Sequence, residues 1–310
     1  MKHDIDSEAE PLATRWRADA VLIAVTAVWG ADFVLVKNLL RDTPPLSFLF
    51  WRFSLAAALI ALVLPWRRRT PGLFADGLVM GLLLALGMGL QIVGQAETTA
   101  SNASFLTGLA SVLTPVAAFL RTRKFPTLEN GLGILLAGAG FVLMTFPGRS
   151  GAINRGDIFV FGCGVVFAFY IVELAERSGR HDSAWFAGIQ IAIVAVAAGA
   201  AALWLEGPAR LASTVTPFVS EPELLVQALF LASVGTAGTF VFQTWAQNHM
   251  SATHAAVIFT LEPVFTAILA AWLLAERLGP RGWLGGVLVL AGIAVSELRL
   301  NRQSTVDSRE

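Results

Sequence analysis

Long apolar runs separated by short polar breaks dominate the chain. Each run approaches the roughly 20 residues that an α-helix needs to cross the apolar core of a bilayer. The runs are continuous rather than alternating, and lipid offers the backbone no hydrogen-bond partner, so helices rather than a barrel are expected. They predict an all-α polytopic membrane protein with ten spans, over residues 18–40, 46–66, 75–96, 101–120, 128–146, 157–175, 184–205, 224–246, 252–274 and 281–298.

Composition agrees with a membrane protein. Of the 310 residues, 55% are hydrophobic and 14% are charged, whereas a soluble domain carries about 25% charged residues. The formal net charge is zero, which argues against a nucleic-acid partner. The sequence has neither a Gly-x-x-x-x-Gly-Lys-Ser/Thr phosphate loop nor a His-Glu-x-x-His metal motif. We therefore expect no enzyme activity, no cofactor and no bound metal.

The distribution of lysine and arginine predicts the orientation. With ten spans and a cytoplasmic N-terminus, the cytoplasmic side would carry fourteen basic residues and the far side seven, and Arg52 would lie within a span. Because cytoplasmic loops carry the excess of basic residues, both chain ends are predicted to be cytoplasmic. The polar stretches 1–17 and 299–310 would be the mobile cytoplasmic tails.

The chain also repeats itself at long range. Gln91 and Gln95 recur as Gln243 and Gln247 at an offset of 152 residues. The alternative is a chance likeness between two apolar segments. If the repeat is real, an odd number of spans in each copy inverts the second copy relative to the first, an arrangement typical of secondary transporters. The two copies would be five-helix units over residues 18–146 and 157–298.

Several motifs carry a resemblance to a known family. They are Val28-Trp29-Gly30, Asp32-Phe33-Val34, Arg52, residues 99–109, Pro115, Leu261-Glu262-Pro263-Val264-Phe265, Ala275-Glu276-Arg277-Leu278 and Ala291-Gly292. In order and duplication they resemble the EamA-like ten-helix permeases of the drug/metabolite transporter superfamily, over roughly residues 18–298. The resemblance implies a multi-pass exporter of small metabolites, such as amino acids, in the bacterial inner membrane. The first copy departs from the family pattern at one place: it has Arg121-Thr122-Arg123-Lys124 where the second copy has the family's Glu276.

Ionisable side chains inside a bilayer are costly, so those in predicted spans are candidates for function. Asp32 and Arg52 both fall in the outer third of their spans and are expected to pair, either as a structural link or as a functional element, namely an outer gate or a carboxylate contact. Glu262 precedes Pro263 near mid-membrane, where proline frees the carbonyl group of Phe259. This carboxylate could receive a cation, a substrate ammonium or a proton, or it could bond a neighbouring helix.

Uncharged polar and aromatic residues complete the candidate site. Gln91 with Gln95, and Gln243 with Gln247, lie one helical turn apart, and each pair would either line a water-filled vestibule or bond other helices. Trp29 lies in the middle of its span, where it would wall a pocket or face lipid. The side chains predicted to line a central cavity are Trp29, Gln91, Tyr170, Gln243 and Glu262.

These features predict a secondary transporter that exports small polar metabolites, with amino acids as the first candidates, by alternating access. One alternative is efflux of drugs or other lipophilic compounds, although such a pocket would need more acidic and fewer amide groups. The other is a non-transporting membrane scaffold, which needs neither a duplication nor buried charges. Proton exchange and uniport both remain open, as does the oligomeric state, a monomer included.

Overall fold

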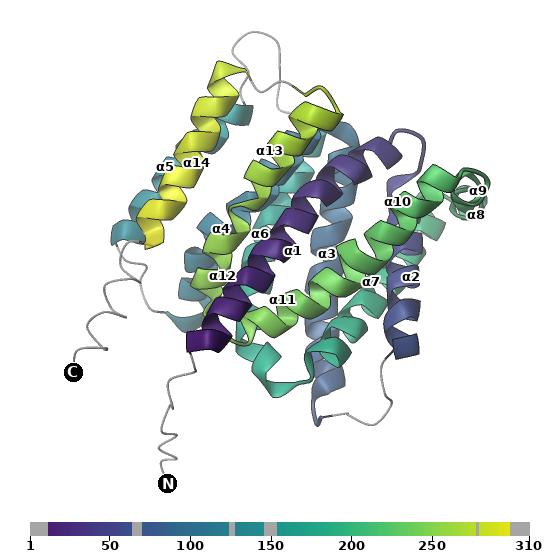
Figure 1. The fold of residues 1–310 in the computed structure, drawn as a ribbon, viewed down its shortest axis with the longest axis horizontal. Helices are drawn as coiled ribbons and strands as arrows, with labels where there is room; N and C mark the ends of the chain where they lie inside the picture. The colour runs from purple at the N-terminus through teal and green to yellow at the C-terminus, as the bar shows by residue number, and fades with distance from the viewer. Residues whose placement is uncertain (1–11, 64–69, 124–127, 146–153, 277–278, 298–310) are drawn as a thin grey trace.

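The computed structural model describes residues 12–63, 70–123, 128–145, 154–276 and 279–297, which form helices and no strand (Figure 1). The first half contains α1 (Leu12–Leu39), α2 (Pro45–Val63), α3 (Leu73–Glu97), α4 (Ala100–Thr122) and α5 (Leu128–Thr145). The second half begins with α6 (Arg155–Arg177), the short turn η1 (Ser178–Arg180) and α7 (Ser183–Leu205). Its remaining elements are α8 (Pro208–Ser213), α9 (Val215–Ser220), α10 (Pro222–Ala232), the π-helical η2 (Ser233–Gly238), α11 (Thr239–Gln247), α12 (Ala252–Phe259), α13 (Glu262–Leu273) and α14 (Pro280–Glu297).

Each predicted span falls on one helix or on consecutive helical segments. Seven segments of the described chain are long and apolar enough to cross a membrane, and one of them is the continuous stretch from α10 to α11. The prediction of an all-α polytopic membrane protein is thereby confirmed, whereas the count of ten crossings stays a prediction. In the eighth span, a π-helical stretch replaces part of the α-helix, and the ninth span, where Pro263 was expected to disturb the helix, is broken at Thr260–Leu261.

The structure has helix in two of the segments that were expected to be polar breaks or tails. Helix α1 begins at Leu12, inside the predicted polar tail 1–17, because residues 12–17 favour helix and no proline or glycine separates them from the apolar run. The polar break after α7 contains the short helices α8 and α9, and Pro208 supplies a helix start there. Residues 1–11 and the predicted tail 299–310 lie outside the described part of the chain.

Local capping explains where several helices begin. The Thr99 side chain accepts a hydrogen bond from the Asn102 backbone N–H at 3.1 Å and so satisfies one free donor at the start of α4. Asn154 and Asp157 form a capping box at the start of α6. Asp182 accepts hydrogen bonds from two backbone N–H groups in the first turn of α7. Polar breaks in the sequence therefore act as helix starts as well as loops.

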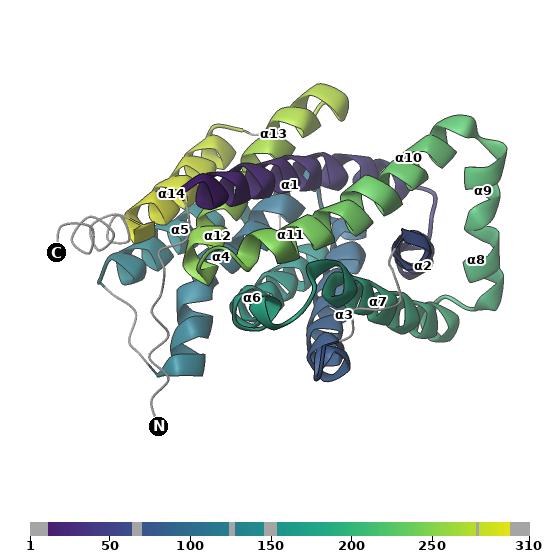
Figure 2. The ribbon, with the colours of Figure 1, turned by 60° about the horizontal axis from the view of Figure 1, so that its bottom comes forward.

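The helices pack in two groups with a pair at the edge. In one group, α4 packs along α6, and α1 packs along α13; in the other, α2 and α3 pack along α7, and α11 also contacts α7. Contacts of α3 with α6 and of α1 with α11 join the two groups. Helices α5 and α14 pack against each other at one edge of the molecule, and α8 and α9 lie at the opposite edge (Figure 2). The start of α1 and the end of α14 lie at the same end of the bundle (Figure 1).

Two apolar clusters support this arrangement. Phe53, Leu84 and Phe186 are fully buried where α2, α3 and α7 meet. A second cluster joins Leu22 of α1 to Phe259 of α12. Each cluster also contains residues of the other helix group, such as Leu174 of α6 in the first and Ala246 of α11 in the second, so the two groups are packed against each other as well.

Candidate functional site

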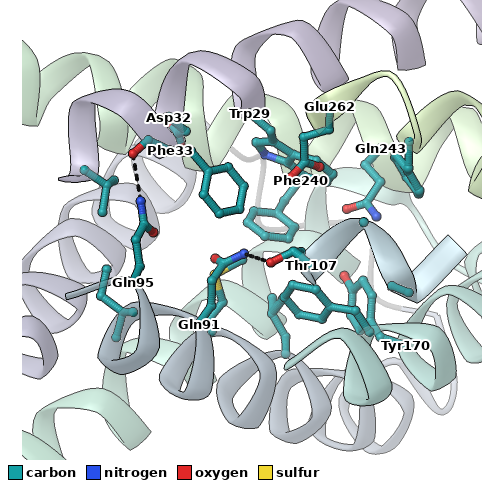
Figure 3. A pocket seen from close by; sticks show the side chains of 18 of the residues that line it. Trp29, Asp32, Phe33, Gln91, Gln95, Thr107, Tyr170, Phe240, Gln243 and Glu262 are labelled. Atoms are coloured by element: carbon teal, nitrogen blue, oxygen red, sulfur yellow. Dashed lines mark hydrogen bonds between the residues drawn. The ribbon is translucent and has the colours of Figure 1, made fainter. Parts of the chain in front are cut away.

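A cavity lies between the two helix groups, and it is lined from α1, α2, α3, α4, α6, α11, α12 and α13. All the predicted site residues contribute to its wall, namely Trp29, Asp32, Arg52, Gln91, Tyr170, Gln243 and Glu262. Figure 3 shows Trp29, Phe240 and Glu262 on one side of this space and Gln91, Thr107 and Tyr170 on the other. The structure thus brings the predicted residues together, while their roles stay predictions.

The break between α12 and α13 places Glu262 at the cavity. Pro263 has no backbone N–H to donate, and its ring disfavours a continuous helix through the residues before it. The chain instead tightens, with the Leu261 N–H donating to the Ile258 carbonyl at 3.1 Å, and a new helix starts at Glu262. Glu262 is 6% exposed, and among the described residues its carboxylate has no hydrogen-bond or ion-pair partner. It is therefore a buried carboxylate that faces a cavity.

Helix α1 approaches this break closely because Gly30 has no side chain. A Cβ atom at Gly30 would lie 3.1 Å from the Thr266 nitrogen and 3.3 Å from the Glu262 carbonyl oxygen. The neighbouring Trp29 ring contacts Phe240, with centroids 5.7 Å apart, and Phe259, with centroids 5.6 Å apart. Trp29 is therefore part of an aromatic wall beside the break rather than a lipid-facing residue.

The glutamines combine the two roles that the sequence left open. Gln91 lines the cavity and donates from Nε2 to Thr107 Oγ1 at 3.3 Å. Gln95 also lines it, but its Nε2 donates to the Phe33 carbonyl of α1 at 2.7 Å (Figure 3). Interhelical bonding and cavity lining are therefore compatible in one glutamine pair.

The second glutamine pair forms a chain of hydrogen bonds. Gln243 lines the cavity and donates from Nε2 to Gln247 Oε1 at 3.0 Å. Gln247 in turn donates to the Ile171 carbonyl of α6 at 3.4 Å. The Oε1 atom of Gln243 is buried and has no partner among the described residues. Since buried polar atoms are nearly always bonded, this orphan acceptor indicates a place for a ligand or water.

Tyr170 contributes its ring rather than a free hydroxyl group. The hydroxyl donates to Gln190 Oε1 of α7 at 2.7 Å, and Gln190 Nε2 donates to the Phe186 carbonyl at 3.0 Å. The Tyr170 hydroxyl and the Gln190 side chain therefore belong to a buried hydrogen-bond network between α6 and α7. Tyr170 lies at the cavity, but its polar atom already has a partner.

Asp32 and Arg52 form the predicted ion pair at the wall of the cavity, and their side chains are 9% and 10% exposed. The Arg52 guanidinium also donates to Thr236 Oγ1 at 2.7 Å and to the Gly235 carbonyl at 3.2 Å. One cation therefore links α1, α2 and η2. The structure shows the pair, and the choice between structural link and gate stays open.

The π-helical turn η2 shapes this contact. Gly235 packs directly on the Asp32 carboxyl group: a Cβ atom there would lie 3.1 Å from Cγ and 3.2 Å from Oδ2. π-helical turns are rare and are frequently found at functional sites. Sequence reasoning missed this turn because the run 224–246 is apolar on average and contains no proline, although Gly235 and Gly238 within it could have marked an irregular helix.

Carboxylates cap helix starts at the end of the bundle where α2 and α4 begin. Glu276 accepts from the backbone N–H groups of Ala100 and Ser101 at 3.0 and 3.2 Å, and from Ser101 Oγ at 2.7 Å. Glu206 caps α2 in the same way, with bonds of 2.6–2.8 Å to Leu46 and Ser47. Negative charge at a helix N-terminus is favourable, so these carboxylates tie the two halves together at this end.

Ion pairs hold the opposite end of the bundle. Arg177 of α6 bonds Asp76 of α3, and it also bonds Glu173 at 2.9 Å. Arg121, from the basic stretch that departs from the Glu276 pattern, contacts Glu173 at 2.9 Å with 47% of its side chain exposed. Lys124 of that stretch lies outside the described residues. Carboxylate caps on helix N-termini therefore hold one end of the bundle, and ion pairs between side chains hold the other.

A sequence model of the EamA-like transporter family matches the chain twice, over residues 16–146 and 154–298. The chain belongs to this family. The EamA-like motifs around Trp29, Asp32, Arg52 and Glu262 are those that meet at the cavity. Membership establishes a multi-pass membrane transporter as the class of protein.

Named relatives extend over nearly the whole chain. An uncharacterized transporter of Archaeoglobus fulgidus is 30% identical over 286 residues, which cover 92% of this chain and 87% of the relative. A probable amino-acid metabolite efflux pump of Escherichia coli is 28% identical over 314 residues, covering 94% and 98% of the two chains. A solved crystal structure matches with a TM-score of 0.63 over 93% of this EamA-like chain and 99% of the other, at 18% identity, which supports the fold alone.

Some residues of the site were not predicted from sequence. Gln190, which anchors Tyr170, is a lone amide in the apolar run 184–205 and could have been found by the test applied to Gln91. Thr107 lies within the motif 99–109, but neither it nor Thr236 was expected to bond another helix, because threonines in helices commonly bond their own backbone. Their importance depends on which helices meet, and the sequence pattern does not show that.

Proposed function

We propose that this chain is a secondary transporter that exports small polar metabolites, amino acids in particular, by alternating access through the central cavity. The observation that carries the proposal is the cavity itself, which charged, amide and aromatic side chains from both halves line together. The name of the E. coli relative supports the solute class. A scaffold would have no need for this buried polar lining.

The arrangement of helices supports an inverted repeat. In an inverted repeat, each predicted span of the first half corresponds to the span five places further along the chain. Under this correspondence the α3–α6 contact matches the α1–α11 contact, and the α4–α6 contact matches the α1–α13 contact. The same correspondence leaves the α2–α7 and α5–α14 contacts unchanged. The family match also falls twice, once on each half. Such repeats around a midplane site are a transporter architecture, in which one group of helices rocks against another.

The same symmetry supports the predicted orientation. An even number of crossings puts both chain ends on one side, and α1 begins and α14 ends at the same end of the bundle (Figure 1). The excess of basic residues assigns that side to the cytoplasm. In this orientation, Glu206 and Glu276 close the outer end, and the Arg177 ion pairs close the cytoplasmic end.

The test is counterflow in proteoliposomes that contain the purified full chain. Vesicles preloaded with an unlabelled amino acid are expected to accumulate the labelled form, whereas protein-free vesicles are not. A panel of amino acids and a lipophilic cationic dye covers both candidate solute classes. Accumulation of the dye alone would overturn amino-acid export in favour of drug efflux, and movement of no solute would overturn the transporter proposal. Repeating the assay with a pH gradient separates proton exchange from uniport.

Lipophilic efflux is kept as a second candidate for one structural reason. Trp29, Phe240 and Phe259 form an aromatic face on the cavity that would suit an apolar solute. The amide groups of Gln91 and Gln243 in the same cavity favour the polar solute. The dye arm of the counterflow panel distinguishes the two.

A further inference from the structure

We propose that the Glu262 side of the cavity is a subsite for a positively charged amine, so that the ammonium group of a solute, rather than its carboxylate, is the feature that the transporter recognises. This inference rests on the proposed transport function and narrows its solute class. It combines the charge balance of the cavity, the surroundings of Glu262 and the direction of the free hydrogen-bonding groups.

The charge balance of the cavity is negative. Its charged lining residues, among those that the structure describes, are Asp32, Arg52 and Glu262. Asp32 and Arg52 neutralise each other in a buried ion pair. Glu262 is left without a counter-ion in a place where an unpaired charge is costly. A cationic group of a solute would supply the missing partner.

The surroundings of Glu262 suit an amine. The Trp29 ring contacts Phe259, which ends α12 just before the break that leads to Glu262, so an aromatic wall adjoins the carboxylate. Tryptophan attracts cations to its face most strongly among the aromatic side chains. Figure 3 shows Glu262 and Trp29 on the same side of the cavity, with Gln243 beside them. A carboxylate next to aromatic faces is a common way to bind an ammonium group.

Most of the free polar atoms at the cavity wall are acceptors. Gln243 Oε1 and the Asp32 Oδ1 carboxylate oxygen accept, and the Ser111 hydroxyl both accepts and donates; all three are buried and have no hydrogen-bond partner within the described part of the chain. The nitrogen donors on the wall each have at least one partner already: Arg52 donates to Asp32, Thr236 and Gly235, Gln91 Nε2 donates to Thr107, and Gln243 Nε2 donates to Gln247. An ammonium group, which only donates, therefore matches more of the free lining atoms than a carboxylate does.

The test compares solutes that share one side chain and differ in charge. Leucine, leucinamide and N-acetylleucine carry respectively both charged groups, only the ammonium and only the carboxylate. Binding to the purified full chain in lipid nanodiscs is measured by calorimetry, and counterflow is measured in proteoliposomes. We expect leucinamide to bind at least as tightly as leucine and N-acetylleucine to bind about tenfold more weakly or not at all.

Glu262→Gln keeps the size of the side chain and removes its charge. It should weaken leucinamide binding about tenfold or more, as expected for loss of a charged partner beside an aromatic face. The matched control is Glu97→Gln, which removes an exposed carboxylate at the end of α3 and should leave binding unchanged. The wild-type solute series does not depend on whether either variant folds.

The two readouts separate failure of the subsite from failure of the transport function. Tight binding of N-acetylleucine, or leucinamide binding that survives a correctly folded Glu262→Gln variant, would overturn the amine subsite even if leucine is transported. Leucinamide binding that depends on Glu262 without counterflow of any solute would support the subsite and overturn the transporter proposal. Absence of leucinamide binding to the folded wild-type protein would overturn the subsite directly.

Discussion

Removing Arg52 is expected to destabilise the protein more than removing Asp32, because the two residues differ in the partners that remain. In Arg52→Gln, Asp32 loses the only ion-pair partner that it has among the described residues, while its side chain stays 9% exposed. An unpaired carboxylate inside a membrane helix costs about 3 kcal/mol. In Asp32→Asn, Arg52 keeps its bonds to Thr236 and Gly235, so the cost should be smaller, about 2 kcal/mol.

The measurement is a double-mutant cycle on unfolding free energies, obtained by titrating the purified protein in mild detergent with a denaturing detergent. The double variant Asp32→Asn with Arg52→Gln leaves no buried charge at this site and should recover about 2 kcal/mol relative to the sum of the single variants. The control is Arg121→Gln, whose side chain is 47% exposed and whose ion pair should contribute less than about 1 kcal/mol. Additive costs at Asp32 and Arg52, or an equally large cost at Arg121, would refute the reasoning.

The same double variant distinguishes the two roles of the pair. A purely structural link predicts that transport recovers together with stability. A gate predicts that stability recovers while the transport rate stays altered, because the neutral pair cannot open and close the link between α1, α2 and η2 in the same way. Rates are measured by counterflow on vesicles matched for the amount of folded protein.

Three further substitutions test other parts of the structure. Gly235→Ala would put a methyl group against the Asp32 carboxyl group and should destabilise the protein by at least about 1 kcal/mol. The control is Gly89→Ala, whose added methyl group meets no atom within 4 Å and should be neutral or stabilising. Equal unfolding midpoints for the two variants would contradict the packing of Gly235 on Asp32. Glu276→Gln should weaken the cap on α4 by about 1 kcal/mol. A cysteine introduced near that end of the bundle should then react faster with a membrane-impermeant labelling reagent. Unchanged labelling would show that the cap does not hold this end closed. Pro263→Ala permits a continuous helix through the break and should slow counterflow at least about tenfold with the protein still folded; wild-type rates would remove the break from the mechanism.

The sequence was most informative where hydropathy and charge act directly. Apolar length predicted the helices, since lipid forces backbone groups to bond within each span. The cost of burying Asp32 and Arg52 predicted that they pair, and the structure shows that ion pair. Pro263 predicted a disturbed helix near Glu262, although not that the helix would break into α12 and α13.

The remaining features depend on which surfaces meet. Gln95 and Gln91 are alike in sequence, yet Gln95 bonds the backbone of α1 while Gln91 bonds Thr107 of α4. Tyr170 was expected at the cavity, but its hydroxyl is held by Gln190 of α7. These outcomes are set by helix rotation and neighbour distance, which a single sequence determines only through the complete fold.

The packing of the helices has a consequence for how the protein can move. One helix group consists of α1, α4, α6 and the α12–α13 pair, and the other of α2, α3, α7 and α11, so each group draws helices from both sequence copies. The chain passes from one group to the other through four short connections, residues 40–44, 98–99, 178–182 and 248–251. A change in the separation of the two groups would need backbone rotation in these few residues, and we therefore expect them to act as the hinges of any such motion.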